Sequence, residues 1–231
     1  MLLQNFLNRE MKIVVKVEID TLTSNGVFDK KKTERLALVL TNLRNSGINI
    51  LLVSSGSIFL GAAKLGLKHM PENQIKKQAV SAVGQVELMK YYRFYFDIYN
   101  QIAAQVLLTS DIINNPVTNQ NVRNTLKNLL SKSIIPVINE NDSVSTDDIE
   151  MNDNYYMVLN VAKIVNAELI LVKSNENGKF QLIPRGKKIP AETISENRLI
   201  DVLKDIFSKI KYHGYLKEHF PGDLNKISYQ N

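Results

Sequence analysis

The chain has 231 residues, a formal net charge of +6, and 44% hydrophobic against 23% charged residues, which are ordinary values for a globular protein. It has no cysteine and three histidines, which excludes thiol catalysis, disulfides and cysteine-ligated metals, and we expect no metal site. A chain of this length buries a sizeable core without such cross-links. We expect an N-terminal extension over residues 1–11 and a single domain over 12–231.

Apolar, β-branched runs alternate with amphipathic stretches along the chain. Strands are predicted at 12–17, 48–53, 102–108, 134–138 and 168–172. Helices are predicted at 30–46, from 57 onward, at 74–98 with a break at Gly84, and at 118–132, 153–166 and 195–211. Asn177-Gly178, between two strand-like segments, predicts a hairpin turn. This alternation indicates an α/β fold, with a mostly parallel central sheet covered by helices on both faces.

The basic charge balance permits an anionic partner such as a nucleotide or a nucleic acid. The basic residues are scattered, however, and the densest run, Lys30–Lys32, opens a predicted helix. We interpret that run as a solvated helix start and expect no nucleic-acid partner. The chain has no apolar run long enough to span a membrane, and its N-terminus lacks a signal-peptide pattern. We therefore expect a cytoplasmic protein with no membrane partner.

Polar clusters close three of the predicted strands: Ser54–Gly56, Asn139–Asp142 and Lys173-Ser174. In open parallel sheets, ligands bind at the carboxyl ends of the strands. Each cluster by itself is also compatible with a plain turn. Three of them in one chain favour a binding site at this edge of the sheet.

Several segments follow one another in an order that carries a family pattern. They are Leu52–Ser57, Gln78-Ala79, Ala82–Gln85, Ala104–Thr109, Arg123–Leu126 and Pro136–Asp142. Together they resemble the glutamate 5-kinases of the amino acid kinase family, over residues 12–172. The resemblance implies a three-layer α/β/α sandwich and an ATP-dependent phosphorylation of the γ-carboxylate of glutamate, the first step of proline biosynthesis. It also implies Mg²⁺ supplied with ATP and no tightly bound cofactor, and it leaves open whether proline acts as a feedback ligand.

The resemblance assigns one group of residues to the amino acid substrate. These are Ser55 and Gly56 in the loop that contacts the substrate, Asp142 on its amino group, Asn154 as a further contact, and Asn139 and Asn141 shaping the loop. An alternative for the Asx side chains is to cap the helix that follows them.

In the family, one half of the site holds the amino acid and the other half, here called the phosphate half, holds ATP and the transferred phosphate. The residues of this chain that match the phosphate half depart more from the family's sequence pattern. Lys16 matches a catalytic lysine that contacts the transferred phosphate, but Glu18 stands where the family has glycine. A glycine there lets backbone N–H groups approach phosphate, whereas glutamate adds a side chain and a negative charge. Tyr155 replaces an aspartate, and Lys173-Ser174 replaces a Thr-Asp pair that contacts the nucleotide, with Gly178 following. Beyond residue 190 the chain has no counterpart of the family's Gly-Thr-Gly-Gly-Met-x-Thr-Lys segment.

Two functions are therefore compatible with the sequence. One is an active glutamate 5-kinase, and the other is an inactive homologue that binds glutamate or proline as a sensor or as a subunit of a complex. Losing one preorganised charge-stabilising donor typically costs roughly 10²–10³ in rate, so the altered phosphate loops decide between them.

Six aromatic residues lie between Tyr91 and Tyr99, on one predicted helix. They spread almost all round that helix, so a single face cannot bury all of them. We expect some to pack in the core and others to form a homo-oligomer interface. A base-stacking surface for nucleic acid is the less favoured alternative.

Overall fold

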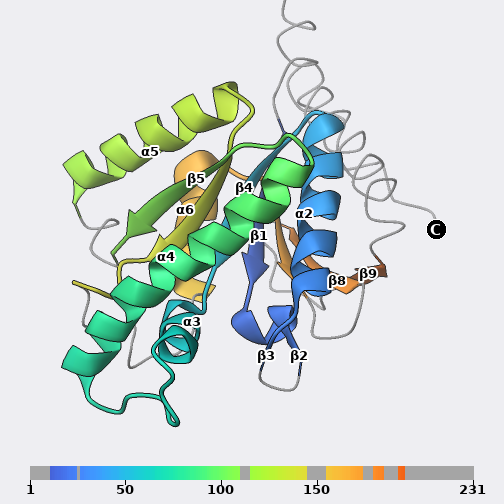
Figure 1. Ribbon diagram of the computed structural model, residues 1–231. Helices are drawn as coiled ribbons and strands as arrows, with labels where there is room; N and C mark the ends of the chain where they lie inside the picture. The colour runs from blue at the N-terminus through green and yellow to red at the C-terminus, as the bar shows by residue number, and fades with distance from the viewer. Residues whose placement is uncertain are drawn as a thin grey trace, which may run out of the picture.

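The computed structural model describes residues 11–24, 27–109, 115–144, 155–173, 179–184 and 192–195 (Figure 1). Within these ranges, seven strands form one sheet in the order β5-β6-β4-β1-β7-β8-β9. The strands are β1 Met11–Val17, β4 Ile48–Ser54, β5 Ala103–Leu108, β6 Ile135–Glu140, β7 Leu169–Lys173, β8 Lys179–Pro184 and β9 Glu192–Ser195. The first five strands of that order pair in parallel, which confirms the predicted mostly parallel sheet.

The strands β7, β8 and β9 pair antiparallel. Antiparallel pairing of β7 with β8 is what a hairpin connection requires, although the predicted turn at 177–178 lies outside the described residues. β9 was not predicted from the sequence. The helix predicted at 195–211 overlaps β9 at its first residue, and the rest of it lies outside the described residues.

Helices cover both faces of the sheet. They are α2 Lys30–Asn45, α3 Ser57–Lys64, α4 Gln74–Ile98, α5 Pro116–Ser131 and α6 Tyr155–Val165. A 3-10 helix, η1 Ile19–Leu22, and a small hairpin of β2 Thr23–Ser24 and β3 Val27–Phe28 follow β1. In Figure 1, α2 and α4 cross in front of the sheet and α6 lies behind it, so the α/β/α layering is as predicted. None of the helices in the described ranges is long and apolar enough to cross a membrane.

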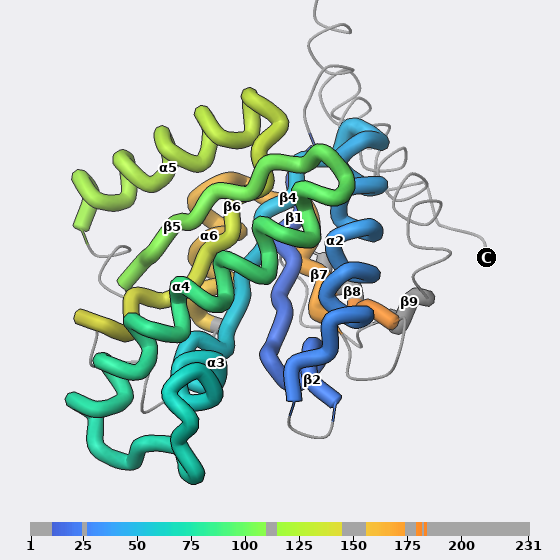
Figure 2. The backbone as a smooth tube through the Cα atoms, viewed as in Figure 1, coloured from blue at the N-terminus to red at the C-terminus, as the bar shows by residue number. Residues whose placement is uncertain are grey.

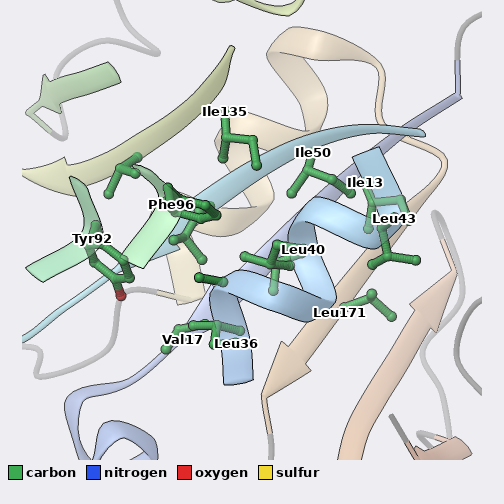
Figure 3. Packing of buried hydrophobic residues seen from close by; sticks show 14 of the residues in the cluster. Ile13, Val17, Leu36, Leu40, Leu43, Ile50, Tyr92, Phe96, Ile135 and Leu171 are labelled. Atoms are coloured by element: carbon green, nitrogen blue, oxygen red, sulfur yellow. The ribbon is translucent and has the colours of Figure 1, made fainter. Parts of the chain in front are cut away.

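Two hydrophobic clusters separate these layers, and the alternation of side chains along β1 explains why. Ile13, Val15 and Val17 point to the cluster under α2 and α4, whereas Val14 points to the cluster under α5 and α6. Figure 3 shows the first cluster, in which leucines of α2 and the rings of Tyr92 and Phe96 from α4 pack onto the sheet. Each such side chain contributes about 1.5–3 kcal/mol when fully buried, so the sheet is held from both sides.

The start of α2 explains the densest basic run of the chain. Asp29 is the N-cap, and its carboxylate accepts hydrogen bonds from the backbone N–H groups of Lys31 and Lys32. Hydrogen bonds from the Ser24 hydroxyl and the Lys32 amide lower the pKa of Asp29 below its ordinary value. Lys30–Lys32 therefore form the first turn of a capped helix, as predicted.

The predicted break at Gly84 is wrong, because α4 is one continuous helix through this residue. Gly84 is instead a point of backbone contact: a Cβ atom on it would lie 1.6 Å from the carbonyl oxygen of Ser57. The contact is reciprocal, since a Cβ on Gly61 would lie 2.0 Å from the carbonyl oxygen of Val80. Figure 2 shows α3 lying beside the first half of α4. Two glycines thus let two helix backbones touch.

We predict that Gly84→Ala lowers the free energy of unfolding by at least about 2 kcal/mol, because the new methyl group displaces α3. Helix propensity alone acts in the opposite direction, by about 1 kcal/mol in favour of alanine. Urea denaturation measures the difference. The control, Ala79→Gly, changes propensity at an exposed position of the same helix. An unchanged or raised stability of Gly84→Ala would contradict the contact.

Candidate active site

The carboxyl ends of β6, β4, β1 and β7 meet at one edge of the sheet, beside α3 (Figure 1). The pairing register sets Lys16 opposite Val53 on one side and opposite Val172 on the other. The predicted site residues that the structure describes all lie at this edge. They are Lys16, Ser55, Gly56, Asn139, Asn141, Asp142 and Lys173. The remaining ones, Asn154, Ser174 and Gly178, lie outside the described residues.

The turns that follow β1 and β4 are in close contact at Gly56. The backbone N–H of Ser55 donates to the carbonyl of Val17 at 3.3 Å, and the N–H of Ile19 donates to the Ser55 hydroxyl at 3.3 Å. Gly56 precedes α3 with φ +106°, and a Cβ on it would lie 2.7 Å from side-chain carbons of Ile19. Only glycine fits both the dihedral angle and the space. The loop that the sequence predicted as a substrate contact is therefore held against the end of β1.

Asp142 connects three elements at the same edge. Its Oδ2 accepts a hydrogen bond from the Ser57 hydroxyl at 2.7 Å and another from the Ser81 hydroxyl at 2.8 Å. Ser57 is the first residue of α3 and Ser81 lies on α4. The carboxylate is thus fixed beside the Ser55-Gly56 loop by two hydroxyl donors. Asp142 was predicted, but neither serine was, because their closeness depends on the contact between α3 and α4.

Asn139 and Asn141 occupy different environments. Asn139 lies within β6, is buried, and donates from Nδ2 to Oε1 of Gln85 on α4 at 2.8 Å. The backbone N–H of Asn141 donates to the carbonyl of Leu108 at 2.7 Å, which ties the loop after β6 to the end of β5. Asn139 therefore connects β6 to α4, whereas Asn141 is half-buried in the loop that follows β6.

A groove of about 770 Å³ opens between α4, β5 and the loop after β6. Its lining includes Ser81, Gln85, Glu140, Asn141 and Asp142 near the loop after β6, and Lys90, Arg93 and Asp97 farther along α4. This volume is in the range of small-molecule sites. The groove extends the predicted substrate loop toward α4, and Gln85 is a lining residue that the sequence analysis did not assign to the site. Its spacing of four from Ser81 puts both on one face of the helix.

Lys16, which the resemblance assigns to the transferred phosphate, forms an ion pair. Its Nζ lies 2.8 Å from Oε1 of Glu18, and its side chain is 7% exposed against 48% for Glu18. The backbone at Glu18 is still extended, with φ −91° and ψ 151°, so side chains 16 and 18 leave the chain on the same side. A buried ammonium and a half-exposed carboxylate therefore form an ion pair at the end of β1.

Lys173 lies at the end of the neighbouring strand but on the other face of the sheet. Lys16 shares the face of Val14, under α6, whereas Lys173 shares the face of Leu171, under α2. The Lys173 ammonium lies 4.7 Å from the centroid of the Phe180 ring, in a cation–π contact. The two buried lysines of the strand ends are therefore separated by the sheet.

The comparisons with known proteins give a family. The model of the amino acid kinase family matches residues 11–209. The chain belongs to the amino acid kinase family. It is 41% identical over 179 residues to a glutamate 5-kinase of Listeria innocua serovar 6a, covering 75% of this chain and 65% of that protein.

A second member of the amino acid kinase family extends the match. The glutamate 5-kinase of Enterococcus faecalis is 38% identical over 210 residues, covering 89% of this chain and 76% of that protein. A solved UMP kinase of Ureaplasma parvum is similar over 71% of this chain and 69% of that chain, with 15% identity and a TM-score of 0.46. The chain spans about two thirds of the length of the curated Listeria relatives that it matches.

The carboxylate of Asp142 gives a prediction about stability. Ser57→Ala and Ser81→Ala each remove one hydrogen bond to a charged group, and each should lower the free energy of unfolding by about 1–2 kcal/mol. In double-mutant cycles with Asp142→Ala, these losses should be strongly non-additive, because the serines then have no carboxylate to bind. Chemical denaturation measures all of them.

The matched control is Ser46→Ala, whose hydroxyl bonds only to a backbone carbonyl of its own helix at an exposed position. It should change stability by less than about 0.5 kcal/mol. Additive effects of the serine and Asp142 substitutions would contradict the shared hydrogen-bond network.

Proposed function

We propose that this chain is a kinase that transfers the γ-phosphoryl group of ATP to the γ-carboxylate of glutamate. The observation that carries the proposal is the combination of the Asp142–Ser57–Ser81 network with a buried lysine at the same sheet edge. Sequence identity of about 40% to glutamate 5-kinases supports the choice of acceptor. In the reaction, a carboxylate oxygen of glutamate forms a bond to the γ-phosphorus while the bond from that phosphorus to the ADP oxygen breaks.

The glutamate half of the site uses fixed polar groups. Asp142 offers a carboxylate for the α-amino group, and its two serine bonds hold that carboxylate in one orientation. Ser55 and Gly56 offer backbone and hydroxyl groups at the start of α3, next to Asp142 in space. A preorganised site of this kind loses little entropy when the substrate binds, which favours a reactive alignment.

The phosphate half uses Lys16. Two anions must approach each other in this reaction, and a cation held at the strand end compensates the charge that they bring together. Lys16 is suited to this because its side chain is nearly fully buried and its ammonium is held by an ion pair. Mg²⁺ would enter as its complex with ATP. Among the described residues, no group of three or more His, Asp or Glu side chains could hold a metal ion, so no step is assigned to a protein-held metal.

The activity test is formation of γ-glutamyl hydroxamate from glutamate, Mg²⁺–ATP and hydroxylamine. Lys16→Met should lower kcat by roughly 10²–10³, because one charge-stabilising donor is lost. Calorimetric binding of glutamate should survive in that variant. Lys64→Met is the matched control, since Lys64 is an exposed lysine at the last residue of α3 that pairs with Glu87.

No hydroxamate from the wild-type chain at high protein concentration, with glutamate binding intact, would contradict the kinase proposal. It would leave the inactive, amino-acid-binding homologue. Proline carries an α-carboxylate and a positively charged ring nitrogen at the α-carbon, so we expect it to compete for the Asp142 site in the same calorimetric experiment.

We also propose that the chain forms a homo-oligomer through α4 and β5. β5 ends the strand order within the described part of the sheet, and an edge strand offers unpaired backbone groups. Of the six aromatics predicted to divide between core and interface, Tyr92, Tyr95 and Phe96 are buried, whereas Phe94 is 61% exposed. Ile102, just before β5, is 62% exposed. A second copy that pairs with this edge would cover both side chains, and with them the part of the groove that Phe94 lines, which leaves the part beside Asp142 for the substrate.

Sedimentation velocity at micromolar concentration tests this interface. The wild type should sediment as an oligomer, and Phe94→Glu should shift it to the monomer because a buried charge opposes association. Ile75→Glu is the control on the same helix, at a side chain that is 74% exposed near the other end. A monomeric wild type, or equal dissociation by both variants, would contradict the proposal.

A further inference from the structure

The ion pair between Lys16 and Glu18 places a carboxylate where an anionic ligand of Lys16 would bind. Oε1 of Glu18 lies 2.8 Å from Nζ of Lys16, which is the distance of a charge-assisted hydrogen bond. The lysine side chain is 7% exposed and the glutamate side chain is 48% exposed. Of the two charged groups, the carboxylate is therefore the one that solvent reaches more easily.

The two partners do not depend on the pair equally. A buried ammonium needs a nearby negative charge, because desolvation without one is strongly unfavourable. A half-exposed carboxylate, by contrast, regains most of its hydration when it rotates into water. Exchange of the Glu18 carboxylate for another anion is therefore inexpensive for Glu18, while Lys16 keeps a counter-charge throughout.

We propose that Glu18 is a displaceable internal counter-ion of Lys16, and that it sets both the affinity and the charge selectivity of this subsite. The inference rests on the proposed function in one respect, namely that Lys16 is the residue that contacts the phosphoryl group. A ligand gains from the exchange only when it brings more negative charge than the carboxylate it replaces. A triphosphate satisfies that condition. A ligand with a single carboxylate does not, because it would only replace the Glu18 carboxylate by another group of the same charge.

This selectivity matters for a site that must hold two different anions. Glutamate has two carboxylates, and an uncovered buried lysine would attract either of them into the phosphate half. With Glu18 in place, that wrong mode of binding brings no electrostatic gain. Glu18 thus lowers the affinity for the phosphoryl donor and, in the same interaction, keeps the acceptor out of the donor's position.

A role of Glu18 as a metal ligand is the competing interpretation. The described residues contain no cluster of acidic or histidine side chains that could hold a metal with it. A carboxylate that is already bonded to an ammonium would also bring a second cation close to the first. The geometry therefore favours the counter-ion role, and the two interpretations predict opposite effects of removing the charge.

The experiment titrates sodium tripolyphosphate into the full chain by calorimetry, in EDTA, with the wild type and four variants. Glu18→Gln keeps the shape and removes the charge, and it should bind tripolyphosphate about tenfold more tightly, a change of about 1.4 kcal/mol. Lys16→Met should abolish binding, and adding Glu18→Gln to Lys16→Met should restore nothing. Glu87→Gln is the matched control, because it neutralises a glutamate of α4 that pairs with Lys64 and Lys90, and it should stay within twofold of the wild type.

Acetate is the second probe. Millimolar acetate should weaken tripolyphosphate binding to Glu18→Gln more than to the wild type, because the variant lacks the Glu18 charge that repels a carboxylate arriving at Lys16. A melting curve of each variant establishes that it is folded. Together these results would support the counter-ion role.

Equal or weaker tripolyphosphate binding by folded Glu18→Gln would overturn the inference, and so would absence of binding by every variant. Weaker binding of Mg²⁺–ATP, with tripolyphosphate unaffected in EDTA, would assign Glu18 to the metal instead. The outcome is independent of the kinase test. A chain in which Glu18→Gln tightens tripolyphosphate binding but the wild type makes no hydroxamate keeps the counter-ion and loses the proposed function.

Discussion

The site depends first on the close contact of α3 and α4 at Gly61 and Gly84. Neither position has room for a Cβ atom, since the nearest backbone oxygens would lie at 2.0 and 1.6 Å. Because the helices touch there, Ser57 and Ser81 come within hydrogen-bond distance of one carboxylate oxygen of Asp142. That carboxylate in turn fixes the loop after β6 beside the turn after β4. A wider spacing of the two helices would separate the serines and release the loop.

The electrostatics of the sheet edge are divided between its two faces. Lys16 lies on the α6 face with Glu18 as a neighbour, and Lys173 lies on the α2 face over the Phe180 ring. These two lysines at the ends of adjacent strands therefore do not form one basic patch. Of these two lysines, only Lys16 belongs to the phosphate half of the proposed site. The neighbouring charge of Glu18 therefore strongly affects how an anion binds there.

Much of the fold follows from the sequence because hydrophobic periodicity is a local signal. The strands and the helices of the described core were predicted within a few residues, as was the α/β/α layering. Gly84 was misinterpreted as a helix break because glycine has low helix propensity, and the sequence does not reveal which backbone lies opposite it. Asn139 was expected in a loop, yet it lies within β6 and binds Gln85, since a buried partner can hold a polar residue inside a strand.

The site was predictable where one residue type at a strand end was sufficient, as for Asp142 and Gly56. It was not predictable where two distant elements had to meet. Ser57 and Ser81 are 24 positions apart, and only the helix contact brings their hydroxyls to 2.9 Å. The pairing of Lys16 with Glu18 was also missed. The sequence shows that both are present, but not that the extended backbone turns them to the same side.

The most direct test of the account is the fate of oxygen in the reaction. Glutamate labelled with ¹⁸O in its γ-carboxylate is incubated with Mg²⁺–ATP and hydroxylamine, and the released phosphate is analysed by mass spectrometry. If the carboxylate attacks the γ-phosphorus, hydroxylamine cleaves the acyl phosphate at carbon, and each phosphate carries one ¹⁸O atom. Phosphate without ¹⁸O would mean that water, and not glutamate held at the strand ends, receives the phosphoryl group.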